Sequence, residues 1–193
     1  MADLTHKQIV AAIQDIFTRS GDDEYLGEPV TMSEHMLQCA LLAEESADSD
    51  ELVVAALLHD IGHFTSELGS FAMDDVVDRL HEEAGAAWLA PYFPSLIVDC
   101  VRFHVPAKRY LCKTDPAYFN GLSQASVHSL SLQGGPMSND EVDAFEQNPN
   151  LDAIVKVRRY DDLAKVAGKS TPPLAHYMVK VQQVADDYYA SRT

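Results

Sequence analysis

The sequence predicts an all-α protein, and two observations favour this class. Apolar residues recur mainly at steps of three and four, which is the helical period, and almost no stretch shows the alternation expected of a β-strand. Short turn clusters, such as SGDDE at 20–24, divide the chain into helical pieces. Because 193 residues suffice for one sizeable core and no internal repeat is present, we expect a single domain over residues 1–193.

The predicted helices begin at capping residues and end at turn clusters. The first covers about 5–20, and either Thr31 or Ser33 can serve as the N-cap of the second. The third follows a cap within 48–50 and is almost wholly apolar, so it must lie at the centre of the fold. The remaining predicted helices cover about 76–90, 95–105, 123–133, 139–148 and 151–168.

Two segments between these helices are long for connectors in a helical domain. They are HFTSELGSFAMDD at 63–75 and HVPAKRYLCKTDPAYF at 104–119. Long connections of this kind often carry function, so we expect both segments to be functional loops.

Charge and composition argue against several classes of partner. The formal charge of −16 disfavours a nucleic-acid backbone or an anionic membrane, because like charges repel. No run of about 18 apolar residues predicts a membrane span, and the polar, acidic start is unlike a signal peptide, so we expect a cytoplasmic protein. The cysteines form no CxxC pair and are expected to be reduced thiols without a metal-binding role. They are Cys39, Cys100 and Cys112.

The strongest local signal is VAALLHDIGH at 54–63, an apolar helix that ends in three ionisable side chains. A polar helix end exposed to water is the ordinary interpretation of such a pattern. The apolar run LVVAALL commits the helix to the core, however, so His59, Asp60 and His63 should face a neighbouring cleft. His35 projects to the core side of the preceding predicted helix, where a neutral imidazole needs a hydrogen-bond partner or a metal.

Two further histidines and a carboxylate would complete a two-metal site. Taken singly, His81 and His104 are a capping and a loop histidine, but together they add two nitrogen donors to the set. Asp60 would bridge the metals, and Asp161 or Asp162 would supply the last carboxylate. A ligand set of nitrogen and oxygen without thiolate suits Fe, Mn, Co, Ni or Zn and does not choose among them.

The two aspartates of VRRYDDLAK at 157–165 are not distinguished by spacing. One can face the core while the other pairs with Lys165 on the solvent side. Outside this constellation, His6 and His176 are expected to be ordinary surface or hydrogen-bonded histidines.

The pattern formed by His35, His59, Asp60 and Asp161 resembles the H…HD…D signature of the HD-domain superfamily, a helical fold that holds one or two metals. Segments outside the signature, among them HEEAGAAWL, HVPAKRYLC and LSQASVHSLSLQGGPM, resemble the phosphonate-cleaving, mixed-valent diiron oxygenases of that superfamily over nearly the whole chain. The resemblance implies a single HD-domain helical bundle with two Fe ions in an Fe(II)/Fe(III) state. It assigns the ligands of one iron as His35, His59, Asp60 and Asp161, and those of the other as Asp60, His81 and His104.

The same resemblance implies the reaction. A 1-hydroxyalkylphosphonate binds at the metals, O2 is the co-substrate, and cleavage of the carbon–phosphorus bond gives a carboxylic acid and phosphate. A trimethylammonio substrate giving glycine betaine is expected, with the 2-amino analogue giving glycine as the close alternative, and a partner hydroxylase would supply the substrate. The competing hypotheses are an HD-domain phosphohydrolase of nucleotides or small phosphate esters, and a non-catalytic metal-binding or signalling module.

A dianionic phosphonate in an acidic protein needs local cations and hydrogen-bond donors. Lys108 and Arg158 are the predicted cations, and Ser126 and Gln133 are the predicted neutral donors. His63 is expected to hydrogen-bond to the phosphonate or to the metal-bound hydroxyl without binding metal.

The loop DDEYLGEP at 22–29 precedes the first ligand helix, and the resemblance implies that it is a lid. Tyr25 would occupy the open iron position in the absence of substrate, and Glu28 would face a positively charged substrate tail. An aromatic ring beside a carboxylate suits an ammonium group. The predicted catalytic residues are therefore Tyr25, Glu28, Asp60 and His63.

Overall fold

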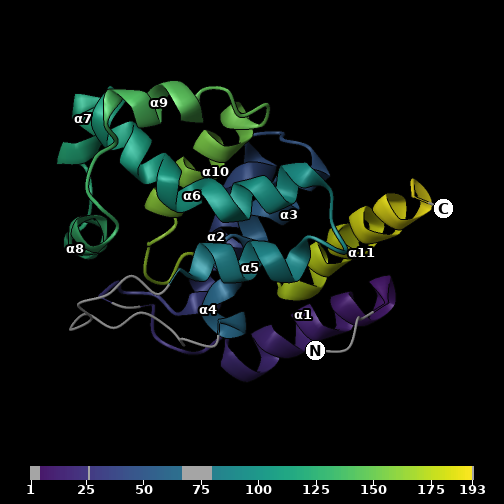
Figure 1. The fold of residues 1–193 in the computed structure, drawn as a ribbon. Helices are drawn as coiled ribbons and strands as arrows, with labels where there is room; N and C mark the ends of the chain where they lie inside the picture. Colours follow the sequence, from purple (N-terminus) through teal and green to yellow (C-terminus); the bar gives the residue numbers. More distant parts are fainter. Residues whose placement is uncertain (1–4, 26, 67–79, 193) are drawn as a thin grey trace.

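The computed structural model describes residues 5–25, 27–66 and 80–192, and over these residues it is helical, as predicted, with no strand (Figure 1). One isolated β-bridge pairs Glu24 with Thr31. The helices are α1 (His6–Ser20), α2 (Met32–Glu45), α3 (Asp50–Leu58), α4 (Gly62–Thr65), α5 (His81–Leu89), α6 (Ser95–Thr114), α7 (Pro116–Asn120), α8 (Gln124–Leu132), α9 (Asn139–Phe145), α10 (Leu151–Leu163) and α11 (Leu174–Ala190).

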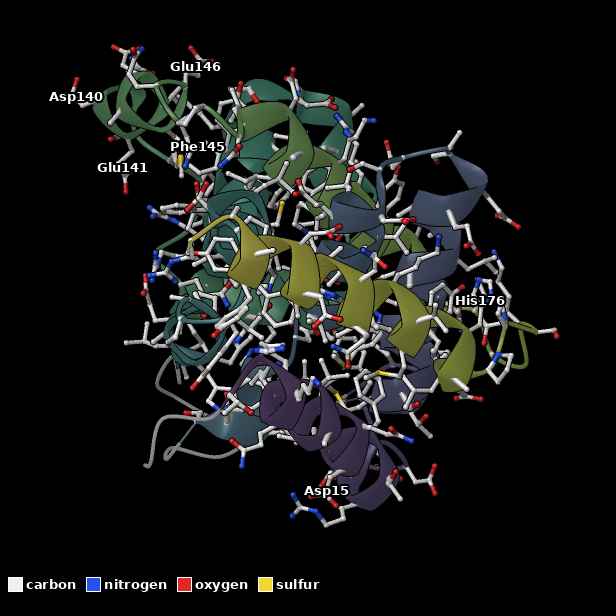
Figure 2. The ribbon with its side chains drawn as sticks, turned by 90° about the vertical axis from the view of Figure 1, so that its right-hand side faces the viewer. Asp15, Asp140, Glu141, Phe145, Glu146 and His176 are labelled. Atoms are coloured by element: carbon white, nitrogen blue, oxygen red, sulfur yellow. The ribbon has the colours of Figure 1, made fainter. Side chains whose placement is uncertain are left out.

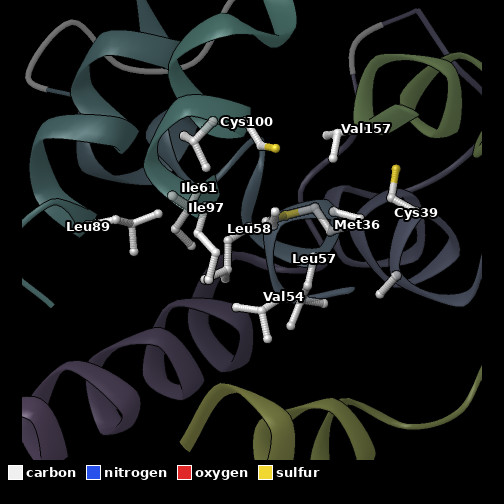
Figure 3. Packing of buried hydrophobic residues seen from close by; sticks show 14 of the residues in the cluster. Met36, Cys39, Val54, Leu57, Leu58, Ile61, Leu89, Ile97, Cys100 and Val157 are labelled. Carbon is white, nitrogen blue, oxygen red and sulfur yellow. The ribbon is translucent and has the colours of Figure 1, made fainter. Parts of the chain in front are cut away.

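Helix α3 lies at the centre of the fold, as its apolar sequence predicts. Ser49 caps its N-terminus, and every residue of 52–58 is buried. The helix packs against α2, α6, α10 and α11. Figure 3 shows Leu57 in the apolar cluster with Met36 of α2 and Ile97 of α6. Since α3 is enclosed on several sides, the polar residues that follow Leu58 emerge inside the protein and not at its surface.

The prediction that 104–119 is a connector is wrong. Helix α6 continues through Pro106 to Thr114, and the short α7 follows it. A proline inside a helix removes one hydrogen bond and costs about 3 kcal/mol. The buried face nevertheless continues through Ala107 and Leu111, and α6 packs against α3, α5 and α10. This packing outweighs the proline, and it places residues 104 and 108 one turn apart on the same helix.

Helix α11 is absent from the sequence prediction, although its apolar residues have helical spacing. Tyr177, Val181 and Val184 are buried at steps of three and four, where α11 packs against α1 and α3. Figure 2 shows α11 crossing the face of the molecule beside α1. Helix α10 is shorter than the predicted 151–168 and ends at Leu163.

Some predictions fall partly outside the described residues. The described part of the predicted helix 76–90 contains α5, whereas 76–79 lies outside the described residues, as does most of the predicted loop 63–75. Acidic side chains such as Asp15, Asp140 and Glu146 are exposed at the surface (Figure 2). None of the described helices is both long enough and apolar enough to span a bilayer.

Candidate metal centre

Asp60 lies in the turn between α3 and α4, and its two carboxylate oxygens face two separate pairs of histidines. The Oδ2 atom is 3.4 Å from Nε2 of His35 and 3.4 Å from Nε2 of His59. The Oδ1 atom is 3.3 Å from Nε2 of His81 and 3.3 Å from Nε2 of His104. With 1% of its surface exposed, Asp60 occupies the position expected of a carboxylate that bridges two metals.

Main-chain carbonyls fix the tautomer of three of these four histidines. In each of the three rings Nδ1 lies within 3.0 Å of a carbonyl oxygen, which can only accept a hydrogen bond, so Nδ1 carries the proton and Nε2 of the neutral ring carries a lone pair. The pairs are His35 with Ala164, His59 with Ala56 and His104 with Val101. This arrangement of the outer nitrogen is typical of metal-binding histidines.

The Nε2 atoms of the four histidines meet in two close pairs, and a cation between the members of a pair would be held by both nitrogens. Nε2 of His35 is 3.1 Å from Nε2 of His59, and the same distance separates the Nε2 atoms of His81 and His104. The buried Oδ2 of Asp60 accepts no hydrogen bond from the described residues. Burial lowers the pKa of His59, but the neighbouring carboxylates raise it to about 9. The cluster therefore attracts positive charge, and its donor set fits a pair of divalent or trivalent metals.

Asp161 lies beside the first pair of histidines, and Asp162 does not. Oδ1 of Asp161 is 3.5 Å from Nε2 of His35 and accepts no hydrogen bond from the described residues, while Oδ2 forms an ion pair with Arg158 at 2.6 Å. Asp162 instead binds Arg158 and the hydroxyl of Tyr118. Oδ1 of Asp161 thus faces the candidate metal position, and Oδ2 faces Arg158.

Two glycines bring His81 close to Asp60. A Cβ atom on Gly62 would lie 1.7 Å from the carbonyl oxygen of His81, and one on Gly85 would lie 3.0 Å from the main-chain nitrogen of Gly62. Side chains at either position would separate α4 from α5. The close backbone contact therefore sets the distance between His81 and Asp60.

A cavity lies over the metal cluster and contains all seven predicted substrate-binding residues. They are Tyr25, Glu28, His63, Lys108, Ser126, Gln133 and Arg158. The cavity is also lined by Lys165, which was predicted to be a solvent-side partner of an aspartate. That pairing is wrong, because Asp162 binds Arg158 and the Nζ atom of Lys165 lies 3.2 Å from Glu28. Contact of these residues with a substrate stays a prediction.

His63 lies beside the second pair of histidines and forms, with Asp60 and His81, a group whose spacing could hold a metal ion. Its ring stacks on His81, with centroids 4.0 Å apart, and its Nε2 is 3.9 Å from Oδ1 of Asp60. Burial and the neighbouring His81 lower the pKa of His63 to about 3, so the ring is neutral near pH 7. A neutral ring at the cavity wall can donate or accept a hydrogen bond with a bound ligand.

The predicted lid residues lie against the centre. The ring of Tyr25 stacks on His35 with centroids 4.0 Å apart, and burial raises the pKa of its hydroxyl well above 10. Glu28 accepts a hydrogen bond of 2.6 Å from the hydroxyl of Ser123, at the start of α8. Tyr25 and Glu28 therefore line one side of the cavity and contact a candidate ligand histidine and the N-cap of α8.

Cys39 is nearer to the centre than predicted. Its Sγ is 3.9 Å from Nε2 of His35, and it is grouped geometrically with His35 and His59. Burial, Asp161 and Asp60 raise the pKa of the thiol. The thiol lies close enough to His35 and His59 to share a metal position with them, although the sequence predicted no metal-binding role for it.

Comparison with known proteins assigns this centre to a family. The HD domain family matches residues 32–125, which hold five of the six clustered ligands. A [1-hydroxy-2-(trimethylamino)ethyl]phosphonate dioxygenase (glycine-betaine-forming) from Leisingera caerulea is 58% identical over 185 residues, covering 96% of this chain and 94% of that protein. The chain belongs to the HD-domain family of phosphonate dioxygenases.

Two further relatives extend the comparison. A hydroxymethylphosphonate dioxygenase from Gimesia maris is 44% identical to this HD-domain protein over 90% of the chain and 86% of the relative. An uncharacterized protein of Acanthamoeba polyphaga mimivirus is 36% identical over 88% of the chain and 78% of the relative.

Proposed function

We propose that this protein is an iron-dependent dioxygenase that cleaves the carbon–phosphorus bond of 1-hydroxy-2-(trimethylammonio)ethylphosphonate and forms glycine betaine and phosphate. The observation that carries this proposal is a single cavity that combines a two-metal ligand cluster with buried cations and a carboxylate. The near full-length similarity to the Leisingera caerulea enzyme supports the same substrate. The 2-amino analogue, which would give glycine, is the second candidate because the same groups suit a primary ammonium.

Two iron ions would be held by the cluster, with Asp60 as the shared ligand. Bound there, they would supply the redox chemistry that a reaction with O2 requires and Lewis acidity toward the substrate. The proposed products contain two more oxygen atoms than the hydroxyphosphonate, so one O2 per turnover balances the equation. The mixed Fe(II)/Fe(III) state belongs to the same proposal.

The phosphonate is proposed to bind among Lys108, Arg158 and Ser126. Their exposed fractions are 3%, 3% and 6%, respectively, and a dianion binds strongly to cations that are shielded from water. Gln133 offers a further contact, because its buried Oε1 accepts no hydrogen bond from the described residues. The C1 hydroxyl of the substrate is a donor that would satisfy it. His63 is proposed to hydrogen-bond to the phosphonate or the same hydroxyl.

The affinity of the cavity for an anion should fall as the pH rises, because Lys108 loses its charge. Burial and Arg158 lower the pKa of Lys108 to about 7, so its ammonium group loses its charge above that pH. We expect the dissociation constant for inorganic phosphate to rise about tenfold between about pH 6 and about pH 8.5 in protein loaded with iron. Isothermal titration calorimetry at the two pH values measures this change.

Lys108→Arg is the control, because a guanidinium keeps its charge at both pH values. The variant should lose the part of the pH dependence that Lys108 causes and keep the part due to phosphate itself. An identical pH dependence in the two proteins would show that Lys108 does not determine it.

One assay tests the proposed reaction. Protein loaded anaerobically with iron should consume O2 and release phosphate in a ratio of about one to one with the trimethylammonio substrate, with a lower kcat/KM for the 2-amino analogue and for hydroxymethylphosphonate. Glycine betaine should appear in the same amount. Phosphate release from phosphate esters under strict anaerobiosis, with no O2 uptake on any phosphonate, would instead establish a phosphohydrolase.

The proposal also covers the cellular location of the enzyme and the reaction that supplies its substrate. A cytoplasmic location agrees with three free cysteines, two of them buried. Since the substrate carries a hydroxyl at C1, an oxygenase or hydroxylase acting on the parent phosphonate is the class of reaction that would supply it.

A further inference from the structure

The main chain around Lys165 is fixed on both sides. The carbonyl of Ala164 accepts a hydrogen bond of 3.0 Å from His35, which is a candidate metal ligand. The next residue, Val166, exchanges two hydrogen bonds with Gln38 of α2, of 3.0 and 3.1 Å. The position from which the Lys165 side chain enters the cavity is therefore tied to the helix that carries the metal centre.

The ammonium group of Lys165 lies in an environment suited to a cation. Its Nζ is 3.2 Å from Oε1 of Glu28, 3.2 Å from Oγ of Ser126 and 5.6 Å from the centre of the Tyr25 ring. The side chains of Lys165 and Glu28 are 11% and 9% exposed. A carboxylate beside an aromatic face, both shielded from water, is a typical binding arrangement for ammonium groups.

We propose that Lys165 is a specificity-determining residue whose ammonium group occupies the subsite that a substrate's cationic tail would enter. This inference rests on the proposed function only for the identity of that substrate. A ligand without a tail would leave the buried pair of Lys165 and Glu28 intact. A ligand with a trimethylammonio tail must displace the lysine, because Glu28 would otherwise meet two cations in one place.

The energetic reason lies in the charge of the pair. While Lys165 is present, its ammonium group balances the negative charge of Glu28. An incoming cation is then only weakly attracted to Glu28. If Lys165 is removed, Glu28 becomes a buried carboxylate without its cation, and such a group binds an external cation strongly. A quaternary ammonium donates no hydrogen bonds, so its affinity depends on this charge and on the ring of Tyr25.

The second contact of Lys165 raises a competing role, since Ser126 is proposed to bind the phosphonate. If Lys165 bound the anion, its loss would weaken every phosphonate. If it occupies the cation subsite, its loss strengthens ligands that carry a cation relative to those that do not. The two roles therefore predict opposite effects on the same variant.

The test is the binding of tetramethylammonium chloride to iron-loaded, anaerobic Lys165→Met, followed by NMR titration. We expect the variant to bind this cation about tenfold more tightly than the unsubstituted protein at equal ionic strength. Lys169→Met is the matched control, because it removes the same charge four residues along at a residue that does not line the cavity. It should bind tetramethylammonium as the unsubstituted protein does. Adding Glu28→Gln to Lys165→Met should abolish the gain.

A turnover measurement gives an independent check. The ratio of kcat/KM for the trimethylammonio substrate to kcat/KM for hydroxymethylphosphonate should rise about tenfold in Lys165→Met. Unchanged or weaker binding of tetramethylammonium would overturn the inference, as would a similar gain in Lys169→Met. The NMR measurement needs no turnover, so it decides the role of Lys165 even if the proposed reaction fails. If Lys165→Met does not fold, Lys165→Gln makes the same test.

Discussion

Asp60→Ala should lose both metals together and with them all O2-dependent phosphate release. One oxygen of Asp60 faces His35 and His59, and the other faces His81 and His104, all at 3.3 to 3.4 Å. Changes to residues that only support metal ligands cost about 10- to 100-fold in metal affinity, and loss of a shared ligand should exceed this. Metal analysis after anaerobic loading with iron should give far fewer than about two ions per chain.

His104→Ala is the informative comparison, because His104 belongs to only one of the two groups. It should lower the iron content by about one ion per chain and leave the group around His35 able to bind metal. Asp15→Ala, at an exposed position on α1, should load like the unsubstituted protein. Retention of two irons by Asp60→Ala would refute the bridging assignment.

The parts of the centre that local sequence could predict are those fixed by helical spacing. The apolar run before His59 committed the end of α3 to the interior, and the structure confirms that Asp60 is buried there. His35 follows Thr31, which forms a capping box at the start of α2, so its place on the buried face followed from the predicted helix.

Other parts depend on contacts between distant segments. Spacing alone left Asp161 and Asp162 open, and the family resemblance favoured Asp161. The packing of α10 against α2 and α3 places Asp161 beside His35 and leaves Asp162 paired with Arg158. The position of His81 depends on Gly62 meeting the backbone of α5. The predicted helix 95–105 stopped short of Pro106, yet α6 continues because its buried face packs against three helices. In α6, tertiary packing overrides the local helix propensity of proline.

The position of Lys165 in the cavity could not be predicted from helical spacing. It was assigned to the solvent side of a helix thought to reach 168, but α10 ends at Leu163 and the chain turns inward. The inward turn follows from hydrogen bonds to His35 and Gln38, which lie about 130 residues earlier. A chain of net charge −16 thereby gathers Lys108, Arg158 and Lys165 in one cavity. An anion is therefore attracted locally although the molecule as a whole repels it.

Arg158→Ala should destabilise the metal-free protein by about 3–5 kcal/mol, because it leaves the buried carboxylate of Asp161 and the partly buried carboxylate of Asp162 without their cation. The side chain of Arg158 is 4% exposed and forms ion pairs with both aspartates. Burial lowers the pKa of this guanidinium, but Asp161 and Asp162 raise it well above its ordinary value, so it stays charged. Urea unfolding measured at pH 7 gives the change in the free energy of unfolding.

The neighbouring Arg159 provides the matched control. Its side chain is 48% exposed and lies 3.3 Å from Asp115, so Arg159→Ala should cost no more than about 1 kcal/mol. Arg158→Lys should fall between the two, because an ammonium keeps the charge but cannot bind both aspartates in the same forked geometry. Equal effects of Arg158→Ala and Arg159→Ala would mean that Asp161 keeps its position without Arg158. In that case iron should also bind normally to Arg158→Ala. We expect instead that the iron affinity of Arg158→Ala falls, because Asp161 loses the contact that orients it.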